Sequence, residues 1–182
     1  MLPHSDLDPV SALMRILAER WVLTLALSDG DHAPYPAPLF YALAEPGALG
    51  DHEAPLLLFA SSAASYHGRL TGAGPILAAA AVYLESETVG VLRGAQLRGL
   101  LVRDDALSEA GAAAARAAYV ARHAPPTLPS GTHIYALIVT WAKLTDNRLG
   151  FGQHPEARFE PRWSALRSPA RQPRADVEQS PT

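Results

Sequence analysis

Three prolines at alternate positions, Pro34, Pro36 and Pro38, constrain the fold of this chain more than any other feature of its sequence. Alternate N–H groups of a strand point to the same edge, and proline has no N–H, so one edge of this segment lacks three hydrogen-bond donors. That edge cannot pair normally with a neighbouring strand. Two interpretations stay open: an edge strand that is protected against aggregation, or a split in the sheet where unpaired backbone faces a flat ligand.

Around this segment, hydrophobic periodicity predicts two helices and five further strands. Asp8 and Pro9 are typical of a helix start, and apolar residues at helical spacing continue to residue 20. A second, alanine-rich helix should begin after Ser108, its expected N-cap, and end before the prolines that follow His123. The expected strands are Trp21–Ser28, Ala33–Ala44, Pro55–Ser62, Ile76–Ser86, Val89–Arg103 and His133–Thr145.

The order of these elements predicts the fold class. Six strands are joined mostly by short turns, including an Asp-Gly turn over residues 28–31 and a turn or short helix over residues 63–75. We therefore expect a mainly β domain with flanking helices, built as a closed or partly closed antiparallel barrel. A parallel doubly wound sheet would need a helix between most strands.

We assign residues 1–155 to this barrel domain, with its N-terminal helix, and residues 156–182 to a C-terminal tail. The tail is rich in proline and arginine and poor in apolar residues after Trp163, so we expect most of it to be disordered. Its first part, around Phe159 and Trp163, is the section able to dock on the domain. A solvated tail is preferred here over a binding arm.

Composition narrows the possible functions. With 15 basic and 18 acidic residues and a net charge of −3, no strongly basic patch is expected, so nucleic acid is not an expected partner. The chain has no cysteine, which excludes disulfides, thiolate metal sites and cysteine nucleophiles. Its histidines show no metal-site spacing. No apolar run is long enough to cross a membrane and no secretory signal is present, so we expect a soluble, cytoplasmic protein.

Several stretches, in order along the chain, resemble the pyridoxamine 5'-phosphate oxidase-like, FMN-binding split β-barrel superfamily. They are the proline segment, the strand that ends "FASSAASYH", the next strand "AAAAVYL" and the stretch "LRGAQLRG". A small uncharacterised bacterial branch of the superfamily is closer still. Its members share "LxRGxQxxG", end in "TDN-x-LGFG", which Thr145–Gly152 matches, and have a histidine where His67 stands. The resemblance covers about residues 10–155 and implies a six-stranded antiparallel split β-barrel.

The resemblance also implies a cofactor. In flavin-binding relatives, FMN lies in the interface of a homodimer, with its phosphate held after the third strand and its ring along the second. In this chain, Tyr66 and His67 replace the arginine and lysine of the superfamily, so FMN is expected to bind weakly. Heme and a deazaflavin are alternatives that the sequence leaves open. The positions assigned to the cofactor are Pro36, Ala37, Pro38, Ser61, Ser62, Ser65, His67, Arg69, Arg93 and Gln96.

Each part of this assignment has a purely structural alternative. The hydroxyls of the serines and the guanidinium of Arg69 suit a phosphate group, yet a polar loop with Ser65 as an ordinary N-cap would look the same. Alternation in the fifth strand places Gln96 and Arg98 on one face and Arg93 on the other. In relatives this region acts across the dimer, but a solvated or interface salt bridge would equally explain its arginines. Gly94 and Gly99 indicate a bulge or a close approach.

The stretch "LTDNRLGFGQ", residues 144–153, is expected to form a hook that closes the barrel and joins the dimer. Asp146 and Asn147 should hydrogen-bond their local backbone in the turn. Phe151, between Gly150 and Gly152, should anchor the hook in a pocket.

Two functions fit these observations. The first is an FMN-binding, oxidoreductase-like homodimer, in which reduced nicotinamide or another small donor reduces the flavin and a small acceptor reoxidises it. The second is a non-catalytic ligand-binding or interaction protein that kept the split barrel and lost tight flavin binding. Flavin chemistry requires little from the protein beyond orientation and a few hydrogen bonds, so no catalytic acid or base is indicated.

Overall fold

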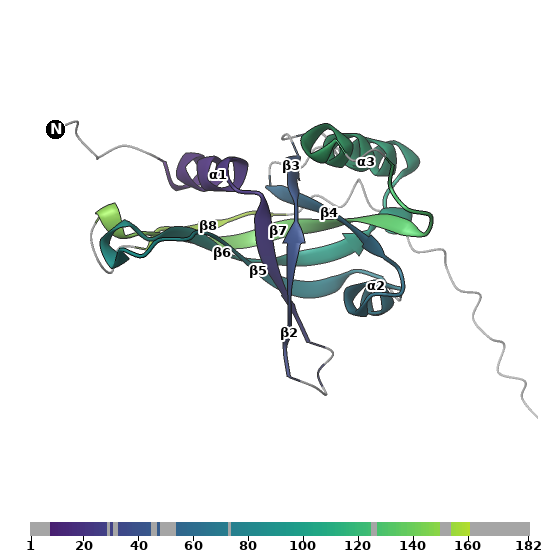
Figure 1. The fold of residues 1–182 in the computed structure, drawn as a ribbon, viewed down its shortest axis with the longest axis horizontal. Coiled ribbons are helices and arrows are strands. Elements are labelled where there is room, and N and C mark those ends of the chain that lie inside the picture. The colour runs from purple at the N-terminus through teal and green to yellow at the C-terminus, as the bar shows by residue number, and fades with distance from the viewer. Residues whose placement is uncertain are drawn as a thin grey trace, which may run out of the picture.

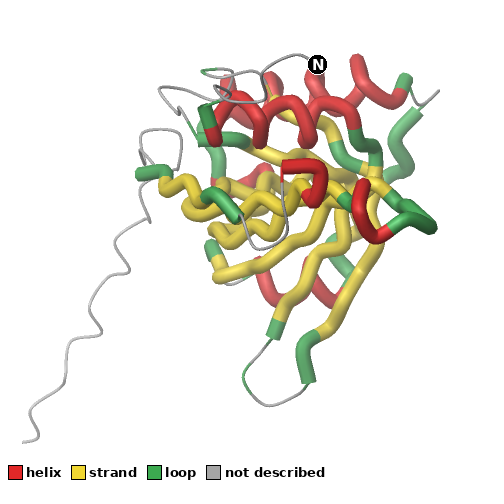
Figure 2. The backbone as a smooth tube through the Cα atoms, turned by 90° about the vertical axis from the view of Figure 1, so that its left-hand side faces the viewer, coloured by secondary structure: helices red, strands yellow, loops and turns green. Residues whose placement is uncertain are grey.

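The structure, a computed structural model, describes residues 8–28, 30, 33–44, 47, 54–72, 74–124, 127–149 and 154–160. In this part of the chain, one curved antiparallel sheet carries eight strands, with helices around it (Figures 1 and 2). The strand order is β2-β1-β5-β6-β7-β4-β3, and β8 pairs with β7. The mainly β architecture and the partly closed antiparallel barrel expected from the sequence are confirmed.

The elements have the following bounds: α1 Pro9–Glu19, β1 Val22–Leu27, β2 Tyr35–Phe40, β3 Ala42–Ala44, β4 Leu56–Ser62, α2 Tyr66–Thr71, β5 Ile76–Leu84, η1 Val89–Val91, β6 Arg93–Arg103, η2 Asp104–Ala106, α3 Glu109–His123, β7 Thr132–Asp146, η3 Asn147–Leu149 and β8 Glu156–Arg158. In Figure 1, α1 and α3 lie above the sheet and α2 lies at its right-hand end. Within these residues, no helix has the length and hydrophobicity needed to span a membrane.

The two helix starts expected from the sequence are confirmed. The Asp8 carboxylate accepts the Ser11 N–H at 3.0 Å, and Pro9 is the first residue of α1. The Ser108 hydroxyl accepts the Gly111 N–H at 3.1 Å at the start of α3. Both caps satisfy N–H groups that have no partner inside the helix.

The strand count differs from the expected six because the segment over residues 33–44 breaks at Tyr41. This residue's N–H donates to the Trp21 carbonyl at 2.9 Å, and its buried hydroxyl donates to the Leu17 carbonyl at 2.6 Å. The chain therefore leaves β1 at this point: β2 pairs with β1, and β3 pairs with β4. Since β2 and β3 stand at opposite ends of the strand order, the sheet must curl to let one short segment serve both.

The eighth strand comes from the segment that the sequence analysis placed at the start of the tail. Glu156–Arg158 pairs with Trp141–Lys143 of β7. The Phe159 N–H donates to the Thr140 carbonyl at 3.0 Å, and the Phe159 side chain packs against the barrel core. Docking of the segment around Phe159 is thus observed, while residues 161–182, including Trp163, lie outside the described residues.

The proline segment is an edge strand. Tyr35, Ala37 and Leu39 stand opposite Leu27, Leu25 and Leu23 of β1, and β2 is the last strand in the order. The residues that carry N–H groups therefore face β1, while the prolines leave the outer edge without donors. The edge-strand interpretation of the prolines is confirmed, while the ligand that the second interpretation places at the split stays a prediction. The missing donors are what keeps the barrel split on this side.

The first four residues of β4, Leu56 to Phe59, are all apolar because both faces of the strand are buried there. Leu57 and Phe59 point into the barrel core together with Leu13 and Leu17 of α1. Leu56 and Leu58 point the other way, into a second apolar cluster with Ala115 and Tyr119 of α3. One strand thus separates the two cores.

Both strand glycines of β6 stand where the backbone is crowded. The pairing of β6 with β7 shifts register between Arg98 and Gly99, which is the expected bulge. A Cβ at Gly99 would lie 2.0 Å from the Ile138 carbonyl oxygen, and one at Gly94 would lie 2.8 Å from the Val82 carbonyl oxygen. The close approach expected at both glycines is confirmed.

We expect Gly99→Ala to lower the free energy of unfolding by about 2–4 kcal/mol, because the two strands must separate to admit the methyl group. Urea denaturation of both proteins would measure the change. Gly90→Ala is the matched control, since a Cβ there meets nothing within 4 Å, and it should stay within about 0.5 kcal/mol of the parent. Equal stability of the Gly99 and Gly90 variants would contradict the crowding at the bulge.

Candidate functional site

The loop between β4 and α2 holds the serines that the sequence assigned to the phosphate. The Ser65 hydroxyl donates to the Ser62 carbonyl at 2.7 Å and accepts the Gly68 N–H at 3.1 Å, so it caps α2. The Ser62 hydroxyl oxygen accepts the Ala64 N–H at 3.1 Å. The loop therefore satisfies much of its own hydrogen bonding. Ser65 is the N-cap of α2, as the purely structural interpretation of the loop expected. Ser61 lies just before this loop at the end of β4.

Arg69 bends back over the same loop. The side chain is exposed, and one terminal nitrogen donates to the Ala64 carbonyl at 2.5 Å. This contact fixes the guanidinium beside the serines while leaving its other N–H groups available. Serines and guanidinium are thus brought together as the sequence analysis expected.

His67 points away from that loop into the barrel. The residue is 4% exposed, and its ring meets the rings of Phe59 and Tyr135 edge to face, with centroids 5.5 and 5.3 Å away. Neither ring nitrogen has a hydrogen-bond partner within the described part of the chain. Burial lowers the pKa of His67 below its usual value. The assignment of His67 to the cofactor remains a prediction that no contact in this structure supports.

The proline edge lies next to this loop. The ring of Tyr35, on β2, contacts the ring of Tyr66, the first residue of α2, at a centroid distance of 4.7 Å. Pro36 and Pro38 are exposed beside it, whereas Ala37 is buried toward the core. The structure thus brings the split edge and the serine loop to one side of the barrel.

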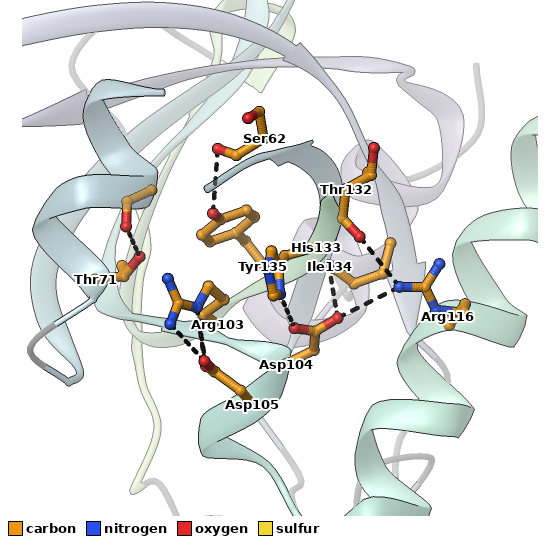
Figure 3. A network of polar contacts seen from close by, with 11 residues as sticks. Ser62, Thr71, Arg103, Asp104, Asp105, Arg116, Thr132, His133, Ile134 and Tyr135 are labelled. Carbon is orange, nitrogen blue, oxygen red and sulfur yellow. Dashed lines mark hydrogen bonds and ion pairs between the residues drawn. The ribbon is translucent and has the colours of Figure 1, made fainter. Parts of the chain in front are cut away.

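A polar network that the sequence analysis missed adjoins the same end of β4 (Figure 3). The Asp104 carboxylate accepts hydrogen bonds from His133 Nδ1 at 2.7 Å and from the Ile134 N–H at 3.0 Å, and Arg116 lies 3.6 Å away. His133 stands directly opposite Ser61 in the ladder of β4 and β7. No sequence motif links Asp104 to His133, because only the register of two strands brings them together.

Next to this network, Arg103 forms a bidentate ion pair with Asp105. The hydrogen bond from Arg103 holds the pKa of Asp105 below its usual range. Tyr135 of β7 contacts the end of β4: its hydroxyl donates to the Ser62 carbonyl at 3.4 Å. Burial raises the pKa of Tyr135. The Asp104 contacts tie η2 to β7, and the Tyr135 contact ties β7 to the end of β4 beside the serine loop.

Arg93 and Gln96 lie elsewhere on the sheet. Arg93 stands at the opposite end of β6 from Arg103, roughly 30 Å away along the strand. Its guanidinium lies 3.7 Å from the Glu19 carboxylate, the kind of salt bridge that the alternative interpretation expected. Gln96 is exposed on the outer face, in a shallow hollow of about 130 Å³ that it shares with Thr145. A single chain does not bring these two residues to the serine loop.

The "TDN" stretch fastens the end of β7 to the connection between β5 and β6. Asp146 bonds its own turn as expected, accepting the Arg148 N–H at 3.1 Å. The expectation for Asn147 was wrong: its side chain donates to the Val89 carbonyl at 2.6 Å rather than to its local backbone. The pairing of Asp146 with Arg93 places Asn147 beside η1, which explains the distant partner. Gly150, Phe151 and Gly152 lie outside the described residues.

With this geometry established, the chain was compared with known proteins. No model of a known protein family matches it, and no curated protein sequence matches it. Solved structures do match. A heme binding protein from Mycobacterium smegmatis has a TM-score of 0.59 at 22% identity, over 84% of this chain and 60% of that one. The present chain therefore spans less than two thirds of that protein's length.

Two further structures match over more of their own length. An FAD binding protein from Mycobacterium smegmatis has a TM-score of 0.53 at 14% identity, covering 84% of this chain and 96% of that one. A FAD-binding protein from Mesorhizobium loti has a TM-score of 0.54 at 17% identity, covering 75% and 92%. The chain is a split barrel. At these identities the likeness concerns the fold, which is the fold that the sequence resemblance implied.

The buried His67 should make stability depend on pH. Below about pH 6.5 the unfolded chain takes up a proton at this residue while the folded chain, with its lowered pKa, does not. The free energy of unfolding should therefore fall as the pH drops below 6.5, until the folded-state pKa is reached. His67→Phe should flatten this fall in urea denaturations between about pH 5 and pH 8.

The exposed His154 provides the control. His154→Gln should keep the parental pH dependence, because it removes a histidine and leaves the buried His67 in place. A His67→Phe variant whose stability falls as steeply as that of the parent would show that His67 is not the buried group responsible.

Proposed function

We propose that this protein binds a flavin, FMN, between the two chains of a homodimer and uses it for oxidation or reduction of a small molecule. The observation that supports the proposal best is the unpaired proline edge of β2 beside the serine loop that precedes α2. A bound flavin would supply hydride and single-electron transfer. The lack of cysteine is compatible with a reducing cytoplasm, where we place this activity.

The residues of the loop fit a phosphate group in part. The hydroxyls of Ser61 and Ser62 would each donate a hydrogen bond to the phosphate. Arg69 would donate the N–H groups that do not bond the Ala64 carbonyl. Ser65 contributes less, since its hydroxyl is already engaged as donor and acceptor. His67 is buried and would have to leave its pocket. A phosphate site with one partly engaged guanidinium and two hydroxyls implies weak binding.

A second copy of the chain would complete the site. Gln96 is exposed on the outer face of β6, far from the serine loop of its own chain, and Thr145 lies beside it. Such a residue serves a cofactor site only if another copy brings it there. In the proposed dimer, Gln96 would meet the ring of the flavin held by its partner, while Arg93 stays paired with Glu19.

A non-catalytic ligand-binding protein is the second candidate. It is favoured by the internal engagement of the loop, in which Ser65 and Arg69 already bond backbone atoms, and by the inward orientation of His67. In this case the split barrel would be retained without tight flavin binding.

The first experiment is an absorbance and fluorescence spectrum of the purified full chain, repeated after adding FMN and desalting. Retention of flavin absorbance bands at about 375 and 450 nm supports the flavin proposal. A colourless protein from which added FMN is fully removed favours the second candidate. Size-exclusion chromatography with light scattering on the same sample tests the homodimer.

The double variant Ser61→Ala with Arg69→Ala should weaken FMN binding at least tenfold, because it removes a free hydroxyl and the only cation of the loop. It should lower the free energy of unfolding by no more than about 1 kcal/mol, as is usual for positions that are not fully buried. Titration of flavin fluorescence measures the affinity. Arg15→Ala, on the exposed side of α1, is the control and should bind FMN like the parent. Undiminished FMN affinity in the double variant would place the phosphate elsewhere.

A further inference from the structure

We infer that the outer face of the sheet carries a second binding site, for a small planar ligand that bears a carboxylate or phosphate group. The site is an open groove of about 1040 Å³, called the outer groove below. It lies between the hairpin of β1 and β2 on one side and β8 on the other. Its lining residues include Ala26, Pro34, Ala79, Arg98, Trp141 and Arg158.

The register of the sheet sets the key residues in one row. Arg98 of β6 stands opposite Trp141 of β7, and Trp141 stands opposite Arg158 of β8. Residues directly opposite one another point to the same face. Neighbouring strands lie about 4.8 Å apart. Trp141 is therefore flanked in this row by two arginines whose Cα atoms are roughly 10 Å apart. This spacing suits a ring placed near Trp141 with an anionic group held from either side.

The same row continues as a floor with small side chains. Ala79 of β5 stands opposite Arg98, and Ala26 of β1 stands opposite Ala79. Gly99, at the bulge of β6, adds no side chain. Methyl groups on this floor leave the space above it free, which is why the groove is large although the sheet beneath it is continuous.

The ring platform is held in place before any ligand binds. The Trp141 Nε1–H donates to the Glu156 carboxylate at 2.9 Å. The Arg98 guanidinium lies over the indole, 4.7 Å from the ring centroid. A ring fixed on its edge by a hydrogen bond loses little freedom on binding. This cation–π contact does not use the guanidinium N–H groups as hydrogen-bond donors, so they stay available to an anion.

Charge points to an anionic ligand. Other arginines of the described chain, such as Arg103, Arg116 and Arg148, lie within ion-pair distance of carboxylates. Within the described residues, neither Arg98 nor Arg158 has a carboxylate within 4 Å. With Glu156 bonded to Trp141, the two arginines and one carboxylate of the lining leave the groove with one net positive charge and two donor forks.

The outer groove differs from the proposed flavin site. None of the residues assigned to the flavin lines it, and from the proline segment only Pro34, which precedes β2, is part of the lining. The inference therefore does not depend on flavin binding, and either can fail alone.

The test is isothermal titration calorimetry of the full chain with two anionic ring compounds, adenosine 5'-monophosphate and benzoate, and with their neutral counterparts, adenosine and benzamide. At least one anionic probe should bind with a Kd below about 1 mM, and its neutral counterpart should bind at least tenfold more weakly. Binding of the nucleotide alone would identify phosphate as the group recognised, and binding of benzoate alone would identify carboxylate. Failure of both anionic probes to bind overturns the inference.

Variants locate the binding. Arg98→Gln and Arg158→Gln should each weaken the anionic probe about five- to tenfold, the usual effect of losing one charged hydrogen bond at a partly solvated site. Trp141→Phe should weaken it without changing the preference for the anion. Ala79→Leu, which fills the floor and keeps both guanidiniums, should also weaken it. Arg15→Gln removes an exposed arginine outside the groove and is the matched control.

All variants should unfold at the parental Tm, which separates loss of binding from loss of fold. Arg98→Gln and Arg158→Gln variants that bind like Arg15→Gln would overturn the inference, because the anion would then be held elsewhere. Equal binding of a neutral counterpart would also overturn it, since the guanidiniums would have no role.

Discussion

Tyr41 connects two strands that follow one another in the chain yet stand at opposite ends of the sheet. Its N–H and its hydroxyl bond to the carbonyls of Trp21 and Leu17, at the junction of α1 and β1. Burial raises the pKa of this phenol well above its usual range, so it stays a hydrogen-bond donor. Tyr41 stands between the residues that pair with β1 and those that pair with β4, so its two hydrogen bonds fix the point at which the sheet curls.

The barrel does not close completely, and the prolines of β2 are the reason. The outer edge of β2 lacks the donors needed to pair, so the barrel stays split beside α2. The same side of the molecule carries the serine loop, held in place by the contacts of Tyr135 and Asp104 with the ends of β4 and β7. An unpaired backbone edge and a loop rich in hydroxyls thus share one opening, and this supports a ligand role there more than any single residue does.

Much of the fold was predictable because it rests on local chemistry. The caps at Asp8 and Ser108 and the alternation along β6 are properties of short stretches, and the structure confirms them. The break at Tyr41 was not predictable, because an all-apolar segment gives no sign of where it changes partner. Strand β8 was missed for a similar reason, since three residues pair only because β7 offers them an edge.

The sequence by itself determined which backbone groups could not pair, where the helices begin and which residue types lie near the split, because these depend on side chains within a few positions. Only the tertiary structure decided which way His67 points, that Asp104 meets His133, and that Arg98, Trp141 and Arg158 form one row. Such arrangements depend on the register between strands distant in the chain. A shift of one residue would turn each side chain to the other face.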